Sequence, residues 1–385
     1  MKLDFQFFVP TRILFGRGRV REAGNYGKGL GKKALVVTGK SSARKSGSLD
    51  KLTKSLEENG VEWVLFDGVE PNPLTTTIDR GAVFARENKV DLVIGLGGGS
   101  AMDTAKGIAF AAANDGPIVD YMEGRTGEKA LPLILIPTTS GTGSEANNIA
   151  VMTNPVTMVK KGFRNPSIFA VVSIVDPDLT ATMPRKVTAS TGIDAFFHAV
   201  ESILSLRCQP FTEILSLKAI ELIYNNIMKA CADGKDSDSR EAMALASTMA
   251  GMALGQSGVC LLHGMEHPLS SYYGASHGEG LAPLAGAFLR FVKPFASERL
   301  AKVAKAMGLD VEGLSADEAA QKAVEAVEQM LKELGLPDSI SQFGVKEEDI
   351  EKLAQHVYKY MGHNLETTPG SPGYEDIKRM YLESL

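Results

Sequence analysis

Histidines are scarce in this chain, and most of them are concentrated in two short stretches. Four of the six lie in GIDAFFHAV (192–200) and LLHGMEHPLSSYYGASHGEG (261–280). The other two, His356 and His363, lack such company, and we expect them to be ordinary surface or interdomain residues. An isolated pair of polar residues is usually solvated or packed in a core, but this concentration, among small and apolar neighbours, favours a common purpose.

The spacing of these residues suggests a metal site. Asp194 and His198 are four residues apart, so on a helix they project from one face and can hold a single ion. His263 and His267 have the same spacing, and His277 precedes a glycine in an apparent turn. One carboxylate and three imidazoles suit Fe²⁺ or Zn²⁺ and do not suit Ca²⁺ or Mg²⁺. The motif HGMEH is not HExxH, because Glu266 directly precedes the second histidine, so a zinc protease is disfavoured.

Two glycine- and hydroxyl-rich loops suggest a nucleotide. GLGGGSAMDTAKG (95–107) follows an apolar strand pattern and opens a helix pattern, so its backbone N–H groups and Ser100 could meet a phosphate. PTTSGTGSE (137–145) follows the next strand and offers many small donors. Either loop alone could be a tight turn without a ligand. Together, at the carboxyl ends of successive strands, they make a nucleotide the leading interpretation.

A third loop bears on which nucleotide is bound. The first strand pattern of the sheet ends at Gly39, where an acidic residue would bind the ribose hydroxyls and repel a 2′-phosphate. The residues that follow combine space, hydroxyl groups and positive charge: Lys40, Ser41, Ser42, Arg44 and Lys45. This mixture favours NADP over NAD. The alternative is a solvated polar loop.

Strand and helix patterns alternate in the first half of the chain, which predicts a mostly parallel sheet covered on both faces. The predicted strands are 33–39, 62–69, 91–97, 131–138 and 169–176, and the helices between them are 48–60, 77–89 and 100–114. The second half shows long helical periods and little strand signal. We therefore predict an α/β nucleotide-binding domain over residues 1–181 and an all-helical domain over 182–385.

Composition narrows the partners and the compartment. The net charge is −5 and no Lys/Arg run stands out, so neither nucleic acid nor an anionic membrane is an expected partner. The three cysteines are odd in number and show no CxxC spacing, which argues against a disulfide framework and fits the cytoplasm. No segment reaches 18 uninterrupted apolar residues, so no membrane span is expected.

With these motifs in order, the chain resembles the iron-containing (group III) alcohol dehydrogenases, relatives of glycerol dehydrogenase and dehydroquinate synthase. The resemblance runs from FVPTRILFGRG (8–18) through the two glycine-rich loops, VDPDLT (175–180) and the histidine stretches, to a C-terminal NLETTPGSPGYEDI. It implies a dehydroquinate synthase-like α/β domain followed by a helical metal-binding domain. Departures are modest: Ala101 replaces a frequent proline, and Ala146-Asn147-Asn148 replaces the usual Val-Thr pattern near the expected substrate pocket.

Carried over residue by residue, the resemblance assigns roles within this sequence. The implied metal ligands are Asp194, His198, His263 and His277. His267 would lie near the nicotinamide, outside the ligand set, as the candidate for relaying a proton to solvent; a packing role is its alternative. The implied cofactor contacts are Gly97, Gly98, Gly99 and Ser100 at the pyrophosphate, Thr138, Thr139 and Thr142 along the adenosine and phosphate path, and Asn72 and Lys160 near the ribose, in addition to Gly39, Ser41 and Ser42.

The implied activity is hydride transfer between NADP(H) and a small alcohol, diol or aldehyde in a homodimer. Fe²⁺, with Zn²⁺ as the second candidate, would polarise the substrate oxygen. The nearest alternative is a glycerol dehydrogenase-like polyol dehydrogenase using NAD. A cyclising lyase is disfavoured because residues 251–285, which lack Lys and Arg, offer no cations for a substrate carboxylate and phosphate. A non-catalytic binding protein is disfavoured by the full ligand set beside two cofactor loops.

Overall fold

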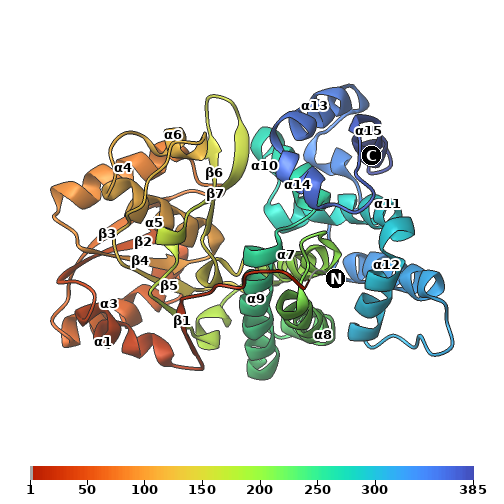
Figure 1. Cartoon of the computed structure of the whole chain (residues 1–385). Coiled ribbons are helices and arrows are strands. Elements are labelled where there is room, and N and C mark those ends of the chain that lie inside the picture. Colours follow the sequence, from red (N-terminus) through yellow and green to blue (C-terminus); the bar gives the residue numbers. More distant parts are fainter. Residues whose placement is uncertain (1–2) are drawn as a thin grey trace. The chain divides into compact units, whose positions relative to one another are not determined.

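The structure, a computed structural model, describes residues 3–385 and forms two compact units (Figure 1). The sheet unit consists of Val9–Met183 and Gly234–Thr248. The helical unit consists of Pro184–Asp233, Met249–Leu385 and the described residues up to Phe8. The chain therefore passes twice into each unit. The division into two domains at residues 181 and 182 stays a prediction.

The sheet unit is built on six parallel strands in the order β1-β8-β5-β4-β2-β3. Their bounds are Arg12–Phe15 (β1), Lys33–Gly39 (β2), Glu62–Val69 (β3), Leu92–Gly97 (β4), Leu133–Pro137 (β5) and Val172–Val175 (β8). The predicted parallel α/β class is thus confirmed. The sequence interpretation missed β1, which has only four residues at the sheet edge, and a separate antiparallel hairpin, Ile149–Asn154 (β6) with Val159–Arg164 (β7).

Helices cover both faces of this sheet, which explains why its central strands are almost continuously apolar. Side chains alternate between faces along a strand. Leu35 and Val37 join the core under α4 (Thr75–Glu87) and α5 (Gly99–Ala112). Val36, between them, joins the opposite core with α1 (Ala23–Lys28) and α3 (Ser48–Glu58). Two short helices, α2 (Ser42–Lys45) and α6 (Ile118–Met122), complete this part of the chain.

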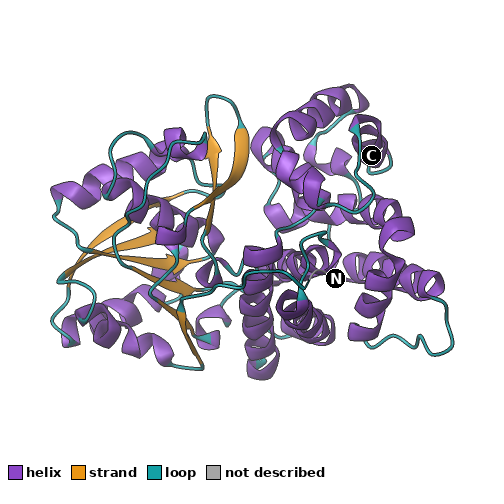
Figure 2. Cartoon of the chain, in the orientation of Figure 1, coloured by secondary structure: helices purple, strands orange, loops and turns teal. Residues whose placement is uncertain are grey.

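Helices alone make up the secondary structure of the helical unit within the described residues (Figure 2). Their bounds are Arg185–Leu204 (α7), Pro210–Ala232 (α8), Ser237–Ser257 (α9), Leu261–Tyr273 (α10), His277–Ala306 (α11), Ala316–Leu334 (α12), Ile350–Tyr360 (α13), Gly362–Thr367 (α14) and Tyr374–Leu382 (α15). The first half of α9, up to Thr248, belongs to the sheet unit. The all-helical character predicted for this half of the chain is confirmed.

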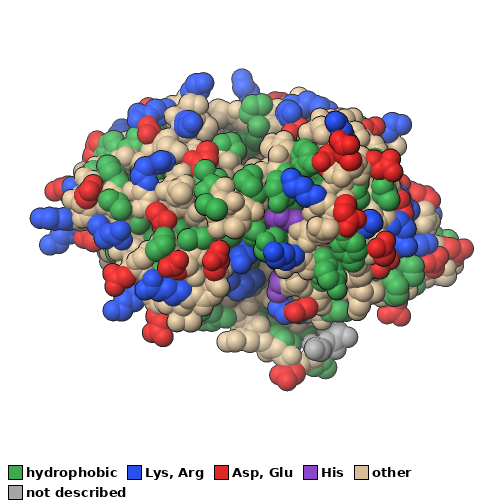
Figure 3. Space-filling view, turned by 90° about the horizontal axis from the view of Figure 1, so that it is seen from above, with side chains coloured by type: hydrophobic (Ala, Val, Ile, Leu, Met, Phe, Trp, Pro, Cys, Tyr) green, Lys and Arg blue, Asp and Glu red, His purple; other side chains and the backbone are tan. Residues whose placement is uncertain are grey.

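Surface charge and helix length are relevant to nucleic acid and membranes as partners. Acidic and basic side chains are interspersed on the face drawn in Figure 3, so this face offers no continuous basic surface. Within residues 3–385, no single helix is long and apolar enough to cross a membrane; α9 and α10 reach that length and apolarity only together, as a bent pair.

Candidate metal centre and cofactor loops

Helix α7 supplies two of the expected metal ligands from its buried face. Asp194 and His198 are one turn apart, 3% and 7% exposed, inside a helix whose residues from Thr188 to Leu204 are nearly all buried. The third, His263, comes from the first turn of α10 and is 2% exposed. Polar groups this deep in a helical core are costly unless they are paired or bind an ion.

His277 was expected in a turn, but it is the first residue of α11. The glycine that follows explains how closely the start of α11 packs on α7. A Cβ on Gly278 would lie 1.9 Å from the carbonyl oxygen of Ser190 on α7, so any other residue would push the two helices apart. Because α11 approaches α7 this closely, the imidazole of His277 reaches Asp194.

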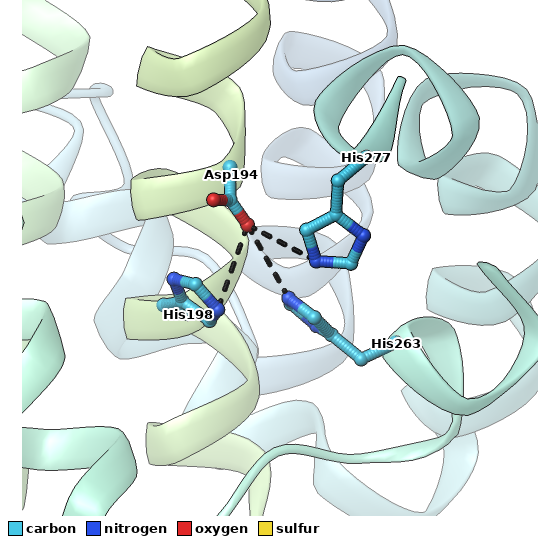
Figure 4. Close-up of side chains that lie close together, drawn as sticks. All are labelled: Asp194, His198, His263 and His277. Carbon is cyan, nitrogen blue, oxygen red and sulfur yellow. Dashed lines mark ion pairs between the residues drawn. The ribbon is translucent and has the colours of Figure 1, made fainter. Parts of the chain in front are cut away.

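The structure brings the four expected ligands around one point (Figure 4). The Nε2 atoms of His198, His263 and His277 each lie 3.5 Å from Oδ1 of Asp194. Two ligand atoms about 2.1 Å from a shared ion at a tetrahedral angle would be about 3.4 Å apart. The observed separations therefore fit one first-row divalent cation.

The hydrogen bonding of this cluster also fits an ion. Oδ1 of Asp194 and Nε2 of His263 are buried and make no hydrogen bond within residues 3–385. Such atoms cost free energy when water is excluded unless a partner satisfies them. One oxygen and three imidazole nitrogens are ligands that suit Fe²⁺ or Zn²⁺.

Ionisation in the cluster is strongly perturbed. Burial alone would lower the pKa of His263, but Glu201 and Asp194 outweigh it and raise this pKa to about 10. Burial would raise the pKa of Asp194, but His198, His277 and His263 hold it well below its usual range. Without a cation His263 therefore retains a proton at neutral pH, and metal binding would release it.

Two glutamates that the sequence interpretation did not assign contact the outer nitrogens of the cluster. Glu201 on α7 contacts Nδ1 of His263, and Glu266 on α10 contacts Nδ1 of His277. Both side chains are fully buried. A signal for Glu201 existed in the sequence, because Asp194, His198 and Glu201 follow an i, i+4, i+7 stripe on one helix face.

His267 lies one turn after His263 on α10 and is half-buried. Its ring centroid is 5.8 Å from that of His277. It is not part of the four-residue cluster, but it forms a second group of possible ligands with Glu266 and His277. Since both groups include His277, His267 lies directly beside the candidate metal centre.

One histidine differs from the sequence expectation. His356, expected at the surface or between domains, is 4% exposed on α13. Its Nδ1 lies 3.1 Å from the hydroxyl of Tyr272. Burial, with Lys352 and Lys359 nearby, lowers its pKa to about 4. His363 is exposed, as expected.

In the sheet unit, the two glycine-rich loops lie against each other. Strand β4 ends at Gly97 beside the end of β5, and Gly98 precedes the first turn of α5. A Cβ on Gly98 would lie 3.1 Å from Oγ1 of Thr139, and one on Gly99 would lie 2.3 Å from Cγ2 of Thr142. A side chain at position 99 would therefore clash with Thr142, and one at position 98 would have little room. The loop contacts expected at Gly97, Gly98, Gly99, Ser100, Thr138, Thr139 and Thr142 are thus gathered at one end of two adjacent strands.

The remaining expected cofactor residues lie on three neighbouring segments of the sheet unit. Gly39 is the last residue of β2, and Ser41 and Ser42 are exposed at the start of α2. Asn72 has a left-handed backbone with φ of 53°. The loop after it bonds to the β6–β7 hairpin, where Thr153 donates to the Pro73 carbonyl and pairs with Lys160.

A buried network under these loops escaped the sequence interpretation. Nζ of Lys106, on α5, donates to Ser144, Asn147 and the Ile149 carbonyl at 2.7–3.2 Å. Ser144 donates in turn to Asp103. Burial lowers the pKa of Lys106 to about 8. The signal was a charged pair three residues apart in an otherwise apolar helix, DTAKGIAFAAA.

Comparison with known proteins agrees with this arrangement along the whole chain. The iron-containing alcohol dehydrogenase model matches residues 10–177, and the model of the family's C-terminal part matches residues 188–385. The chain is 37% identical over 358 residues to the NAD-dependent methanol dehydrogenase of Bacillus methanolicus, covering 92% of this chain and 93% of that protein. It is 38% identical over 362 residues to the 1,3-propanediol dehydrogenase of Klebsiella pneumoniae, covering 92% of each.

A solved structure shares the fold in full. An archaeal halo-thermophilic alcohol dehydrogenase from a Red Sea brine pool superposes with a TM-score of 0.96 at 38% identity, covering 100% of both chains. The two family models, the relatives and this structure agree with one another. This protein is an oxidoreductase that belongs to the iron-containing alcohol dehydrogenase family.

Proposed function

We propose that this protein is a metal-dependent alcohol dehydrogenase that transfers a hydride between NADP(H) and a small alcohol, diol or aldehyde. The observation that carries the proposal is the convergence of three imidazole Nε2 atoms, each 3.5 Å from one carboxylate oxygen, in a buried site. The ligands of the ion would be Asp194, His198, His263 and His277. Fe²⁺ is the proposed ion, and Zn²⁺ is compatible with the same ligands.

The bound cation would polarise the substrate oxygen and favour loss of its proton. The chain's own residues supply the rest. Asp194 and the three imidazoles fix where that oxygen lies. The half-buried imidazole of His267, beside His277, is placed to pass the released proton towards solvent. The glycine-rich loops bind the pyrophosphate through backbone N–H groups and the helix α5 N-terminus.

His267→Ala separates the relay role from ligation and from packing. The variant should keep its metal and lose rate at neutral pH, because the other four side chains still hold the ion. Small external imidazoles should restore part of the rate. A variant that loses its metal would make His267 a ligand, and one with full rate would leave it a packing residue.

For the cofactor, the room and charge beyond β2 support NADP(H). A Cβ on Gly39 would meet only Oγ of Ser42 at 3.7 Å and the Val69 carbonyl at 3.9 Å, so a 2′-phosphate would have space here. Lys40 and Lys45 add positive charge. Arg44, however, already pairs with Asp67 at 3.1 Å. That ion pair, with a relative described as NAD-dependent, favours NAD(H) as the second candidate.

The ratio of kcat/KM for NADPH and NADH decides between these cofactors. We expect the ratio to exceed one, and Gly39→Asp to reverse it because a carboxylate repels the 2′-phosphate and binds ribose hydroxyls. Equal loss with both cofactors would show instead that the variant damages the loop. A wild-type preference for NADH would overturn the NADP proposal.

The substrate class is tested with a panel of short alcohols, diols, glycerol and the matching aldehydes. The 1,3-propanediol dehydrogenase of Klebsiella pneumoniae and the methanol dehydrogenase of Bacillus methanolicus support small substrates. We expect primary alcohols and their aldehydes to exceed glycerol in kcat/KM. A preference for glycerol with NAD would favour the polyol dehydrogenase alternative.

We also propose a homodimer that works in the cytoplasm. Large apolar side chains are exposed on the helical unit: Leu3, Phe211 and Ile214 are 81%, 53% and 66% exposed. Phe5 and Phe7 pack on Phe211, so these three rings form one patch. A patch of this kind marks an interaction site. The molar mass in solution should be twice that of the chain, and Ile214→Glu should lower it. The three cysteines are buried free thiols, which suits a reducing compartment.

A further inference from the structure

The candidate metal centre is surrounded by a second layer of buried acidic groups. Glu201 and Glu266 are not members of the group formed by Asp194, His198, His263 and His277. Each instead contacts the far ring nitrogen of one ligand, His263 or His277, and each is fully buried. A buried carboxylate is costly unless its environment satisfies it, so two such groups at one site call for a role.

Glu201 holds His263 at two points. One carboxylate oxygen contacts Nδ1 of the ring, and the other accepts the backbone N–H of the same residue at 3.4 Å. The backbone carbonyl of Glu201 lies 3.4 Å from Sγ of Cys260, just before α10. These contacts of Glu201 connect the start of α10 to α7. They leave the imidazole of His263 little freedom to rotate.

Glu266 contacts His277 in a similar way and is itself hydrogen-bonded to a serine on the same helix. One of its oxygens contacts Nδ1 of His277, and the other accepts the hydroxyl of Ser270, one turn later on α10. Gly280 on α11 leaves room for this carboxylate: a Cβ there would lie 3.0 Å from Cγ and Oε1 of Glu266. A larger residue at position 280 would crowd the carboxylate that contacts His277.

In a neutral imidazole one ring nitrogen carries the proton and the other carries a lone pair. A carboxylate beside one nitrogen favours the tautomer with the proton on that nitrogen. An acceptor at Nδ1 places the proton there and leaves the Nε2 lone pair free. In both His263 and His277, Nε2 is the atom 3.5 Å from Oδ1 of Asp194. The negative charge behind each ring also makes its Nε2 a stronger donor.

We infer that Glu201 and Glu266 are positioning residues that fix the tautomer and orientation of His263 and His277 for metal binding. The inference rests on the proposed metal function of the four ligands. Removing the charge while keeping the shape, as in Glu201→Gln or Glu266→Gln, should weaken metal affinity about 10–100-fold. Ser270→Ala should weaken it less, because Glu266 then keeps its contact with His277.

The test is the dissociation constant of the purified protein for Fe²⁺, or for Co²⁺ as a spectroscopic probe, measured anaerobically against a competing chelator. Asp176→Asn is the matched control. Asp176 is 1% exposed and accepts the backbone N–H groups of Gly18 and Val20 within the sheet unit. Its loss should leave metal affinity unchanged. The visible ligand-field spectrum of bound Co²⁺ should shift in the two glutamate variants and not in the control.

The outcomes are distinguishable. If the wild-type chain binds no metal with all four ligands present, the proposed function fails. If it binds metal and both glutamate variants match its affinity and Co²⁺ spectrum, the inference is wrong, even if their melting temperatures fall. Should Glu201→Gln not fold, Glu266→Gln and Ser270→Ala decide, because Ser270 loses only a hydroxyl. A graded loss with Glu266→Gln larger than Ser270→Ala supports the inference.

Discussion

Two buried polar clusters, one in each unit, differ in what they leave unsatisfied. Under the cofactor loops, each N–H of Lys106 has an acceptor and both oxygens of Asp103 accept a hydrogen bond. In the helical unit, Oδ1 of Asp194 and Nε2 of His263 are as deeply buried but make no hydrogen bond among residues 3–385. Burial and charge are common to both clusters. In the helical unit the buried atoms without a hydrogen bond belong to side chains that converge on one point, which is the arrangement we propose for an ion.

Because of this difference, mutations in the two clusters should affect different properties of the protein. A closed network holds the loops in shape, so breaking it should cost folding stability. The proposed ion would complete the open cluster, so removing a ligand should cost metal binding and activity more than the stability of the metal-free chain. Mutations in the two clusters should therefore fail in different assays.

The largest effect is expected in the open cluster. His263→Ala and His277→Ala should each lose the metal and at least about 10⁴-fold in kcat/KM, because cation polarisation of the substrate oxygen contributes several kcal/mol. Metal content by mass spectrometry and steady-state rates measure both. The stability of the metal-free variants should change far less than their activity. Full metal occupancy in either variant would contradict its assignment as a ligand.

The next effect concerns the closed cluster. Lys106→Met leaves Asp103 buried without its cation and should lower the free energy of unfolding by about 3–5 kcal/mol. Denaturant unfolding of the metal-free protein measures this. Lys54→Met, whose side chain is 76% exposed, is the control and should change stability by less than about 0.5 kcal/mol. If Lys106→Met behaves like the control, the network does not support the fold.

The smallest effect concerns His356, a buried histidine outside both clusters. Its folded pKa of about 4 lies below the ordinary value of 6.5. The unfolded chain therefore binds a proton between these values while the folded chain does not, so stability falls as pH is lowered through this range. Between pH 7 and 5 we expect His356 to contribute about 1–2 kcal/mol of this loss.

His356→Gln keeps a hydrogen-bond acceptor for Tyr272 and cannot titrate. Unfolding of wild type and variant across this pH range should show a steeper decline for the wild type. Parallel stability curves would mean that His356 is protonated in the folded state as readily as in the unfolded one.

The sequence predicted regular elements well where their periodicity was strong. The strand expected at 33–39 is β2 to the residue, and the helix expected at 48–60 is α3, Ser48–Glu58. The hairpin β6–β7 was missed because its strands carry Asn, Lys and Arg and lack a clear alternation. The four-residue β1 is too short to show a period.

That Asp194, His198, His263 and His277 lie together could be predicted from the sequence and the family resemblance, but the residues that contact their outer nitrogens could not. Histidine concentration and spacing pointed to the ion, and the family resemblance selected His263 and His277 over His267. Glu201 and Glu266 were not assigned because their role depends on α10 and α11 meeting α7, which no local pattern encodes. Gly278 and Ser190 are 88 positions apart in the chain, so their contact also could not be predicted from a single sequence.

The central claim is that one divalent cation is held by Asp194, His198, His263 and His277. Anomalous diffraction at the iron edge, from crystals of the Fe²⁺-loaded protein, tests it directly. The claim predicts a single strong peak per chain about 2.0–2.2 Å from Oδ1 of Asp194 and from the three Nε2 atoms. A peak elsewhere, or an empty cluster in crystals whose protein contains stoichiometric iron, would contradict it.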